Sequence, residues 1–389
     1  MFPIIPADSA GGTGNEGLFG YGSNGGDQSI TNKVSNAGVV SSDIAGVGTA
    51  RAWVSACEYG GDKGIFGFGW TGSRVGMTNL VSNAGVVASD VTAVGTARNN
   101  LAACGYGYDK GIFGFGHTGS YTGITNLVSN AGVVATDVTG VGTARGGPAA
   151  CEYGGDKGIF GFGGIYFLTS VSNLVSNSGV VATDTTGVGT SRQKLEACSY
   201  GDDKGIFGFG QSPLRSMTNL VSNTGVVASD TAGVGTARSG LAACEYGGDK
   251  GIFGYGNNGG QYSITNLVSN AGVVASDTTG VGTAREGPAA CGYGGDKGIF
   301  GFGHPYMVYA SMTNLVSNAG VVATDVTGVG TARYHLAACE YGGDKGIFGY
   351  GNTGSGTAVS NLVSNAGVVA SDTTGVGTAR WYIAACSFN

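Results

Sequence analysis

The sequence has few prolines, no cluster of basic residues and no long apolar run. No apolar stretch approaches the roughly 20 residues that a membrane-spanning helix needs, and residues 1–14 lack the basic start and apolar stretch of a signal peptide. Glycine is abundant, with 79 in 389 residues, but it does not recur at every third position, which excludes a collagen helix. A net charge of -6 argues against a nucleic-acid partner. We expect a soluble chain without a cleaved leader, membrane insertion or nucleic acid.

One unit of sequence is repeated eight times along the chain. Each copy has a single cysteine, and successive cysteines are 46 to 48 residues apart. The eight are Cys57, Cys104, Cys151, Cys198, Cys244, Cys291, Cys339 and Cys386. An arginine precedes each cysteine by six residues. A fixed period of this length is typical of solenoids and propellers, so we expect one repeat domain rather than two or three separate domains.

The unit that starts at Arg98 predicts strands, because its apolar runs are four to six residues long and are interrupted by Gly, Asn and Asp. The expected strands are 101–106, 110–115, 124–129 and 133–136, with tight turns at 107–109 and 130–132. Gly111 and Gly114 lie inside the second strand, where no turn needs them, so neighbouring sheets should approach closely there. Four short antiparallel strands per repeat are typical of a β-propeller blade.

The two ends of the sequence match complementary parts of the repeat unit. Residues 15–22 match the second strand of the unit, and residues 381–388 match the first strand. Pairing of these terminal strands would complete one blade and remove an unpaired sheet edge. We therefore predict an all-β, eight-bladed β-propeller of four-stranded antiparallel blades, closed by the C-terminal strand on the N-terminal strands of the first blade. Residues 15–389 would form this single domain around a central channel, and residues 1–14 an N-terminal extension.

The order of motifs in the unit resembles the Kelch repeat over residues 15–389. An arginine and a small-residue strand are followed by a glycine turn, KGIFGFG, a variable loop, TNLVSNAG and VVASD. FGFG stands where Kelch motifs have paired glycines, and the tryptophan that usually follows the third strand is absent. Near-identical tandem repeats with this sequence also resemble Kelch-like proteins of tailed-phage virions, of the tail or fibre type. The resemblance implies a propeller fold and a place on a virion.

Two segments of the repeat vary while the rest hardly changes: the loop between the second and third strands, and the pair of residues after the arginine. In an antiparallel meander both segments leave the same edge of the sheet, so we expect them on one face, the loop face. Exposed aromatic side chains on loops over a rigid scaffold are typical of a recognition surface, and the unvarying opposite turns argue against free drift. The predicted ligand-binding residues are Trp53, Trp70, Arg74, Tyr121, Tyr166, Phe167, Arg215, Tyr262, Tyr306, Tyr309, Tyr334, His335, Trp381 and Tyr382.

Other candidate sites have simpler interpretations. The cysteines lack a CxxC pattern for zinc, and equivalent inner strands should lie too far apart for disulfides, so we expect buried free thiols and assembly in a reducing cytoplasm. The charges of the framework arginines, lysines and aspartates cancel, and we expect solvated or local ion pairs of little energy. A glutamate follows the cysteine in alternate units, so a hydrated cation could bind in the channel, although relief of like-charge repulsion explains this pattern more simply. These glutamates are Glu58, Glu152, Glu245 and Glu340.

No clustered acid, base and nucleophile breaks the symmetry of the repeats, so we expect no enzyme activity and no cofactor. The sequence favours a non-enzymatic binding propeller, a virion-associated adhesin whose loop face binds a host surface carbohydrate or protein. Two alternatives stay open: a structural virion or scaffold component whose loops contact other virion subunits, and a carbohydrate-acting enzyme. The expected location is the virion or the extracellular space.

Overall fold

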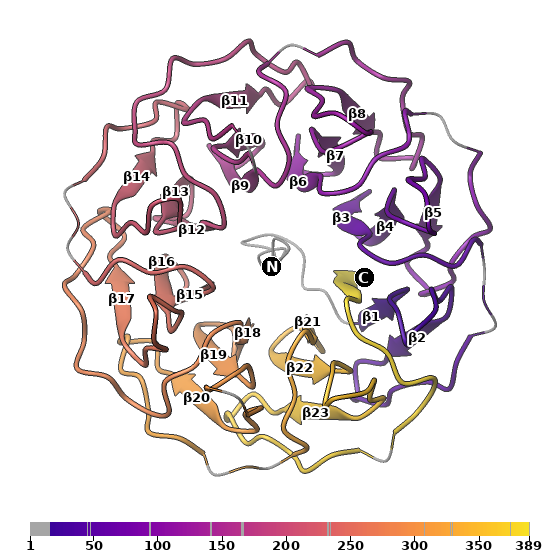
Figure 1. Cartoon of the computed structure of the whole chain (residues 1–389). Helices are drawn as coiled ribbons and strands as arrows, with labels where there is room; N and C mark the ends of the chain where they lie inside the picture. The colour runs from indigo at the N-terminus through magenta and orange to yellow at the C-terminus, as the bar shows by residue number, and fades with distance from the viewer. Residues whose placement is uncertain are drawn as a thin grey trace.

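The computed structural model describes residues 16–388 except 45, 47, 93, 94, 141, 165, 166, 232, 234, 307, 327, 329 and 374. These residues form eight three-stranded antiparallel sheets and no helix. The sheets are arranged in a circle around a central opening, with one strand of each sheet nearest the centre (Figure 1). The fold is all-β and propeller-like, and the described part of the chain has no helix that could cross a membrane. The predicted extension, residues 1–14, lies outside the described residues.

Each sheet has an inner, a middle and an outer strand. The inner strands are β3 (Ser55–Tyr59), β6 (Ala102–Tyr106), β9 (Ala149–Tyr153), β12 (Glu196–Tyr200), β15 (Ala242–Tyr246), β18 (Ala289–Tyr293), β21 (Ala337–Tyr341) and β24 (Ala384–Phe388). The middle strands are β1 (Glu16–Gly20), β4 (Lys63–Gly67), β7 (Lys110–Gly114), β10 (Lys157–Gly161), β13 (Lys204–Gly208), β16 (Lys250–Gly254), β19 (Lys297–Gly301) and β22 (Lys345–Gly349). The outer strands are β2 (Thr31–Val34), β5 (Thr78–Val81), β8 (Thr125–Val128), β11 (Ser172–Val175), β14 (Thr218–Val221), β17 (Thr265–Val268), β20 (Thr313–Val316) and β23 (Ser360–Val363).

The first three strands of each unit lie where the sequence predicts, and their register gives each sheet two apolar faces. In the sheet β6-β7-β8, Cys104 lies opposite Ile112, which lies opposite Leu127. The core is formed between sheets: Ile65 of one sheet and Phe113 of the next belong to one buried cluster, and both are fully buried. Burying both faces of every sheet against neighbours supplies the main stabilising term of the fold.

The prediction of a fourth strand is wrong. In the sheet β6-β7-β8, the segment expected to form it has no continuous strand pairing with β8 and makes isolated bridges instead, such as Val128 with Val134. The Asn126 side chain donates hydrogen bonds from Nδ2 to Ala135 O (3.1 Å) and to Asp137 Oδ1 (2.9 Å). Because these side-chain bonds replace part of the main-chain ladder, the blades are three-stranded and the fourth segment is an irregular outer edge.

The last strand of the chain completes the first sheet. β24 pairs antiparallel with β1, from Phe388 opposite Glu16 to Ala384 opposite Gly20, and β1 pairs in turn with β2. Each inner strand contacts the inner strands of two other sheets, and β24 contacts both β21 and β3. The two ends of the described chain are therefore joined by main-chain hydrogen bonds within one sheet.

Gly111 and Gly114 in β7 let the neighbouring sheets approach closely. A Cβ on Gly111 would lie 2.6 Å from Sγ of Cys57 in the preceding sheet. A Cβ on Gly114 would lie 2.7 Å from Cζ of Phe160 in the following sheet. Both distances are far below van der Waals contact, so only glycine fits, and the expected close approach is confirmed.

The framework arginines are buried, so the expectation of solvated ion pairs is wrong for them. All eight are 0% exposed, and each guanidinium lies over an aromatic ring of the preceding sheet, as Arg98 lies 4.0 Å from the Phe68 centroid. Arg98 Nε donates to Phe115 O (2.9 Å), and Nη2 donates to Asn126 Oδ1. Burial lowers the pKa of Arg98 to about 10, which leaves the guanidinium charged at neutral pH.

An aspartate completes each of these interactions between sheets. Asp137 accepts hydrogen bonds from the Thr96 backbone and hydroxyl and from Asn126, and its Oδ1 lies 3.9 Å from Nη1 of Arg98. We call the set of arginine, threonine, asparagine and aspartate between two sheets a seam. The same residues form the seam that joins the two chain ends, where Thr378 and Arg380 contact Asp43 and Asn32.

The cysteines are free and buried, as the sequence predicts. Burial raises the pKa of the Cys151 thiol to about 12, and that of Cys339 likewise to about 12. Nucleophilic chemistry needs the thiolate, which is scarce at such a pKa, so the cysteines act as small apolar side chains.

Candidate functional site

The two variable segments lie side by side at one edge of each sheet. Asn99 N donates to His117 O (3.1 Å), and His117 N donates to Asn99 O (2.8 Å). Ala52 and Trp70 form the same bridge in the preceding sheet. The predicted loop face is therefore confirmed, and a shared backbone frame presents its differing side chains.

The second residue of the variable pair has a left-handed backbone in every sheet. φ lies between 52° and 65° at Trp53, Asn100, Gly147, Lys194, Gly240, Gly287, His335 and Tyr382. Glycine adopts this conformation without strain, whereas any other side chain costs roughly 1 kcal/mol. Large rings at this position therefore carry a backbone cost, as the buried Phe115 ring of the framework also does (φ 62°). Unlike Phe115, the residue at this position differs from sheet to sheet, and variable strained positions are expected at functional sites. Sequence reasoning missed the strain, although three glycines among eight positions were a signal for it.

Aromatic side chains from neighbouring sheets form a continuous row. The ring centroids of Trp53 and Trp70 are 6.1 Å apart, and those of Trp53 and Tyr382 are 6.4 Å apart. Tyr382 in turn lies 4.4 Å from the ring of His335. The fold thus brings together side chains from the first and last repeats of the chain.

The row continues beyond His335 into the loop after β19. The ring centroids of His335 and Tyr334 are 3.9 Å apart, and Tyr334 stacks on Tyr309 at 5.0 Å with an interplanar angle of 12°. His304 lies 5.6 Å from Tyr334 and 5.8 Å from Tyr309. Burial lowers the pKa of His335 to about 4, so this ring is neutral at physiological pH.

At its other end the row reaches the sheet β6-β7-β8 through Arg74. The guanidinium lies 5.5 Å from the Trp70 centroid, and its Nη2 lies 2.6 Å from Nδ1 of His117. The His117 ring lies 5.2 Å from that of Tyr121. Burial and the Arg74 charge lower the pKa of His117, which favours the neutral ring that can accept this hydrogen bond. We call the row the aromatic arc: Tyr309, His304, Tyr334, His335, Tyr382, Trp53, Trp70, Arg74, His117 and Tyr121.

The arc contains eight of the predicted ligand-binding residues and adds two histidines that the prediction left out. The predicted residues that the arc does not contain are Tyr166, Phe167, Arg215, Tyr262, Tyr306 and Trp381. Tyr166 lies outside the described residues. Phe167 and Tyr306 are 85% and 70% exposed, and Trp381 is half-buried, with its backbone paired to Ser23. The predicted residues in the arc differ from the others in that their side chains contact one another, which sequence comparison cannot show.

The loops that the arc does not reach include a polar group. Gln193 Nε2 donates to Ser212 Oγ (3.0 Å), and Ser239 Oγ donates to Gln211 Oε1 (3.0 Å). The backbone frame is unchanged, with bridges from Gln193 to Gln211 and from Ser239 to Asn257. We call these five residues the polar sector. Four of its side chains hydrogen-bond in two pairs and none of the five is aromatic, so the loop face is chemically divided.

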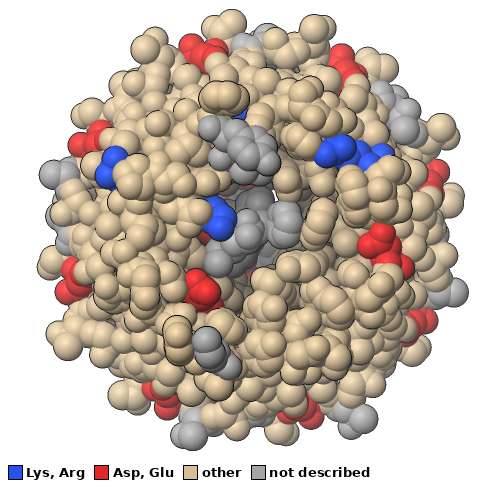
Figure 2. Space-filling view, in the orientation of Figure 1, with Lys and Arg blue, Asp and Glu red and all other residues tan. Residues whose placement is uncertain are grey.

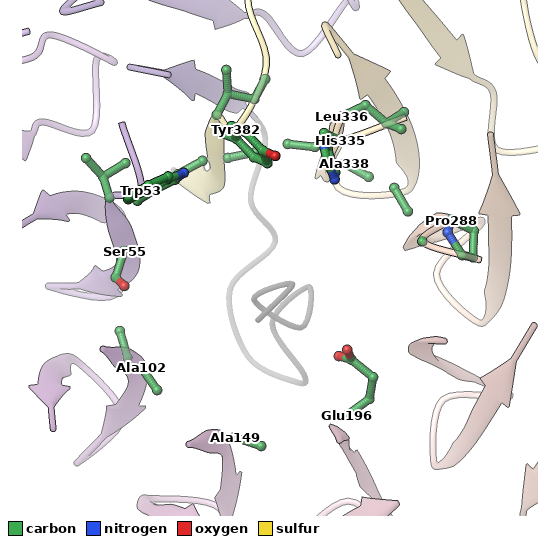
Figure 3. Close-up of a pocket in the computed structure, with 18 of the residues that line it drawn as sticks. Trp53, Ser55, Ala102, Ala149, Glu196, Pro288, His335, Leu336, Ala338 and Tyr382 are labelled. Atoms are coloured by element: carbon green, nitrogen blue, oxygen red, sulfur yellow. The ribbon is translucent and has the colours of Figure 1, made fainter. Parts of the chain in front are cut away.

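The inner end of the arc opens into a pocket with a volume of about 380 Å³, which is within the range of small-molecule sites. We call it the channel-mouth pocket. Trp53, Tyr382 and His335 form an aromatic wall, and most other lining residues are alanine, leucine or another apolar residue (Figure 3). Among the described residues that line the pocket, the acids are Glu196 and Glu286, and none is Lys or Arg.

Glu196 is a functional candidate that sequence reasoning missed. It is the first residue of β12, whereas the other inner strands begin with Ser or Ala. It is 7% exposed, and its carboxyl group points into the opening (Figure 3). Burial raises the pKa of Glu196 to about 8. When the repeats are aligned, Glu196 is the one acid at a position that otherwise holds Ser or Ala. A comparison confined to the loops does not reveal this difference.

The four glutamates of the predicted channel ring follow the cysteines of alternate inner strands. Oε1 of Glu152 occupies the space that a Cβ on Gly105 would need, and Glu340 has the same relation to Gly292. Glycine in these two sheets thus leaves room for the glutamate of the next sheet, and the other two alternate positions hold Ser199 and Ser387. No group of three or more His, Cys, Asp or Glu within the described chain is placed to hold a metal ion.

Charged side chains are sparse on the face shown in Figure 2. Basic and acidic groups lie apart from one another there, and neither sign forms an extended patch. A ligand that meets this face therefore contacts mainly uncharged atoms.

Comparisons with known proteins bear on the fold. No family model matches the chain, and no curated protein matches its sequence. Among solved structures the chain is similar to a novel fungal alcohol oxidase of the AA5 family in complex with copper, with a TM-score of 0.54. The two are 15% identical, over 79% of this chain and 70% of that chain. That protein is an enzyme, but at this identity the likeness shows a shared fold alone.

Proposed function

We propose that the chain is a closed eight-bladed propeller that acts as an adhesin, without enzyme activity, and binds its ligand at the aromatic arc. Pairing of β24 with β1 supports closure. The observation that carries the function is the left-handed position: Trp53, His335 and Tyr382 hold a strained backbone and place their rings in one connected row. The residue at this position varies between sheets, so its backbone cost is not part of the constant framework, and such strain is expected where side chains serve binding.

A surface carbohydrate is the ligand class that the arc suits best. Sugar rings have apolar faces that pack on flat aromatic side chains, and their hydroxyl groups reach polar atoms at the ring edges. A row that extends across several sheets suits a chain of sugar units better than a single sugar. The resemblance of the repeat to Kelch-like virion proteins supports a setting in which a particle attaches to a host surface.

The test compares glycine substitutions at equivalent positions of the loop face. Trp53→Gly removes a ring from the arc, and Lys194→Gly removes a side chain beside the polar sector. Both positions have φ values that glycine adopts freely, 57° and 52°, so neither variant should unfold. On a glycan array, Trp53→Gly should lose at least about tenfold in affinity, equivalent to 1.4 kcal/mol, while Lys194→Gly should bind like the wild type.

Two results would contradict the proposal. Equal glycan binding by the wild type, Trp53→Gly and Tyr382→Gly would show that the arc is not the binding surface. Failure of the folded wild-type chain to bind any glycan would show that the ligand is not a carbohydrate.

A further inference from the structure

Arg74 is the one lysine or arginine in the aromatic arc, and within the described chain no acid forms an ion pair with it. Its Nη2 lies 2.6 Å from Nδ1 of His117, and its guanidinium lies 5.5 Å from the Trp70 centroid. The framework lysines differ, because each forms an ion pair with the aspartate that precedes it, as Lys110 does with Asp109. The charge of Arg74 is therefore not neutralised by a described side chain.

Arg74 and His117 offer hydrogen-bond donors that no described residue accepts. A guanidinium only donates, so a neutral His117 accepts from Arg74 at Nδ1 and holds its own proton on Nε2. Burial and the Arg74 charge lower the pKa of His117, which keeps the ring neutral. Nη1 of Arg74 and Nε2 of His117 donate to no described residue, and neither atom is buried. Donors beside a positive charge suit an anionic oxygen.

The loop edges around Arg74 contain no acid that would repel an anion. The variable segments of the sheets β3-β4-β5, β6-β7-β8 and β9-β10-β11 have neither Asp nor Glu. Asp90 and Asp137, the seam aspartates of the first two sheets, accept hydrogen bonds from threonine and asparagine. At the opposite end of the arc, Oε1 of Glu286 lies 3.9 Å from Nδ1 of His304. An anionic group is therefore favoured at the Arg74 end and disfavoured at the Glu286 end.

The aromatic side chains at this end separate an acidic sugar from a free inorganic anion. Trp70 lies beside the guanidinium and 6.1 Å from Trp53, and Tyr121 lies 5.2 Å from His117. An inorganic anion gains nothing from these rings. An acidic sugar has an apolar ring face that can pack on an aromatic side chain while its anionic group reaches the donors.

We propose that the end of the aromatic arc at Arg74 and His117 binds the anionic group of an acidic sugar, whose ring packs on the adjacent aromatic side chains. The inference rests on the proposed function and names the charge of the sugar unit at one end of the glycan. The carboxylate of a uronic acid and a sulfate ester both supply this chemistry. Neutral sugar units would extend from this end along the rest of the arc.

The experiment applies the full chain to an array with three matched sets of glycans. One set contains neutral oligosaccharides of glucose, galactose and mannose, and the other two contain the same chains ending in a uronic acid or in a 6-sulfated sugar. We expect the uronic acid set, the sulfated set or both to bind at least about tenfold more tightly than the neutral set. The set that shows the difference identifies the anionic group.

Arg74→Gln removes the charge and keeps a polar side chain, and Lys194→Gln removes a positive charge from an exposed position of the loop face outside the arc. Arg74→Gln should weaken binding of the acidic glycans about tenfold or more and change binding of the neutral ones by less than about threefold. Lys194→Gln should change either by less than about threefold. The backbone of Arg74, and not its side chain, bridges to Trp70, so Arg74→Gln should remain folded, which circular dichroism checks.

The imidazole signals of His117 give a second readout that does not depend on a long glycan. The sequence has three histidines, so NMR can resolve them, and the loss of one signal in His117→Gln assigns it. Titration with glucuronate should shift the His117 signal and leave that of His304 in place. Titration with glucose, which lacks the carboxylate, should shift neither.

Equal binding of the neutral and acidic sets would overturn the inference, as would an acidic preference that survives Arg74→Gln. Equal losses in Arg74→Gln and Lys194→Gln would show a general attraction to positive charge and no site. If neutral glycans bind through Trp53 without an acidic preference, the inference is wrong and the proposed function stands. If glucuronate shifts His117 while no glycan on the array binds, the acidic-sugar site stands and the proposed function is wrong.

Discussion

The seams between sheets and the loop edges of the same sheets differ in what the eight repeats hold constant. Every seam keeps the same side chains, because each guanidinium is enclosed by a ring, carbonyl groups and an amide from two sheets. Every loop edge keeps only its backbone, namely one bridge and one left-handed residue, and its side chains range from glycine to tryptophan. The difference assigns stability to the seams, and the loop edges are the surface at which we propose that the chain binds its ligand.

Loss of a seam arginine should have the largest effect on stability. Arg238 Nε donates to Tyr255 O (2.6 Å), Nη1 to Thr236 O (3.0 Å) and Nη2 to Asn266 Oδ1 (2.6 Å). Arg238→Met leaves these acceptors without a donor, so the free energy of unfolding should fall by about 3–5 kcal/mol in urea titration.

The matched control for Arg238→Met is Arg215→Met on a loop edge, which should change the free energy of unfolding by no more than about 0.5 kcal/mol. The folded fraction of Arg238→Met should retain glycan binding. Similar losses of stability in both variants would erase the distinction between seam and loop edge.

A glycine at a close approach should have the next largest effect. A Cβ on Gly208 would lie 2.8 Å from Cζ of Phe253, whereas a Cβ on Gly260 in a loop would meet no atom within 4 Å. Gly208→Ala should therefore lower the free energy of unfolding by about 1–3 kcal/mol, and Gly260→Ala should leave it unchanged. Thermal unfolding measures both, and equal midpoints would show that the sheets can move apart at this contact.

A fall in pH should destabilise the seams because it protonates their aspartates. The loss of stability for each aspartate should be smaller than for the arginine and glycine substitutions above. Burial by itself would raise the pKa of Asp230, but hydrogen bonds from Thr190 and Asn219 outweigh burial and hold the pKa below its usual value. Because the pKa is lower in the folded state, the stabilisation is present above the unfolded pKa of about 4 and is lost as the pH falls through the folded value.

Asp230→Asn should accordingly cost about 1 kcal/mol at neutral pH and reduce the acid dependence of the free energy of unfolding. Asp202→Asn, in an exposed turn, is the control and should change neither quantity. Denaturant titrations between about pH 3 and pH 7 measure the difference. An acid dependence that Asp230→Asn leaves intact would mean that other carboxyl groups control it.

The positions of the first three strands of each unit followed from local pattern, whereas the two errors arose from side-chain hydrogen bonds. Short apolar runs interrupted by glycine located β6, β7 and β8, and two glycines with no turn to explain them predicted close packing. The fourth strand was wrong because Asn126 bonds to the backbone that a strand would pair. The arginines were misjudged because each lies over a ring of the preceding sheet and bonds to groups far along the chain, as Arg98 does to Phe115 and Asn126, which hydrophobic pattern does not reveal.

By itself the sequence determined the repeat, its strands, the division into constant and variable segments and the face on which the variable segments meet. These features depend on neighbours within about one repeat, so the order of residues contains them. Only the tertiary structure decided which aromatic residues join into an arc, which position is strained and that Glu196 points into a pocket. Those features depend on contacts between the first and last repeats and on backbone angles set by the packing of whole sheets, which no local pattern encodes.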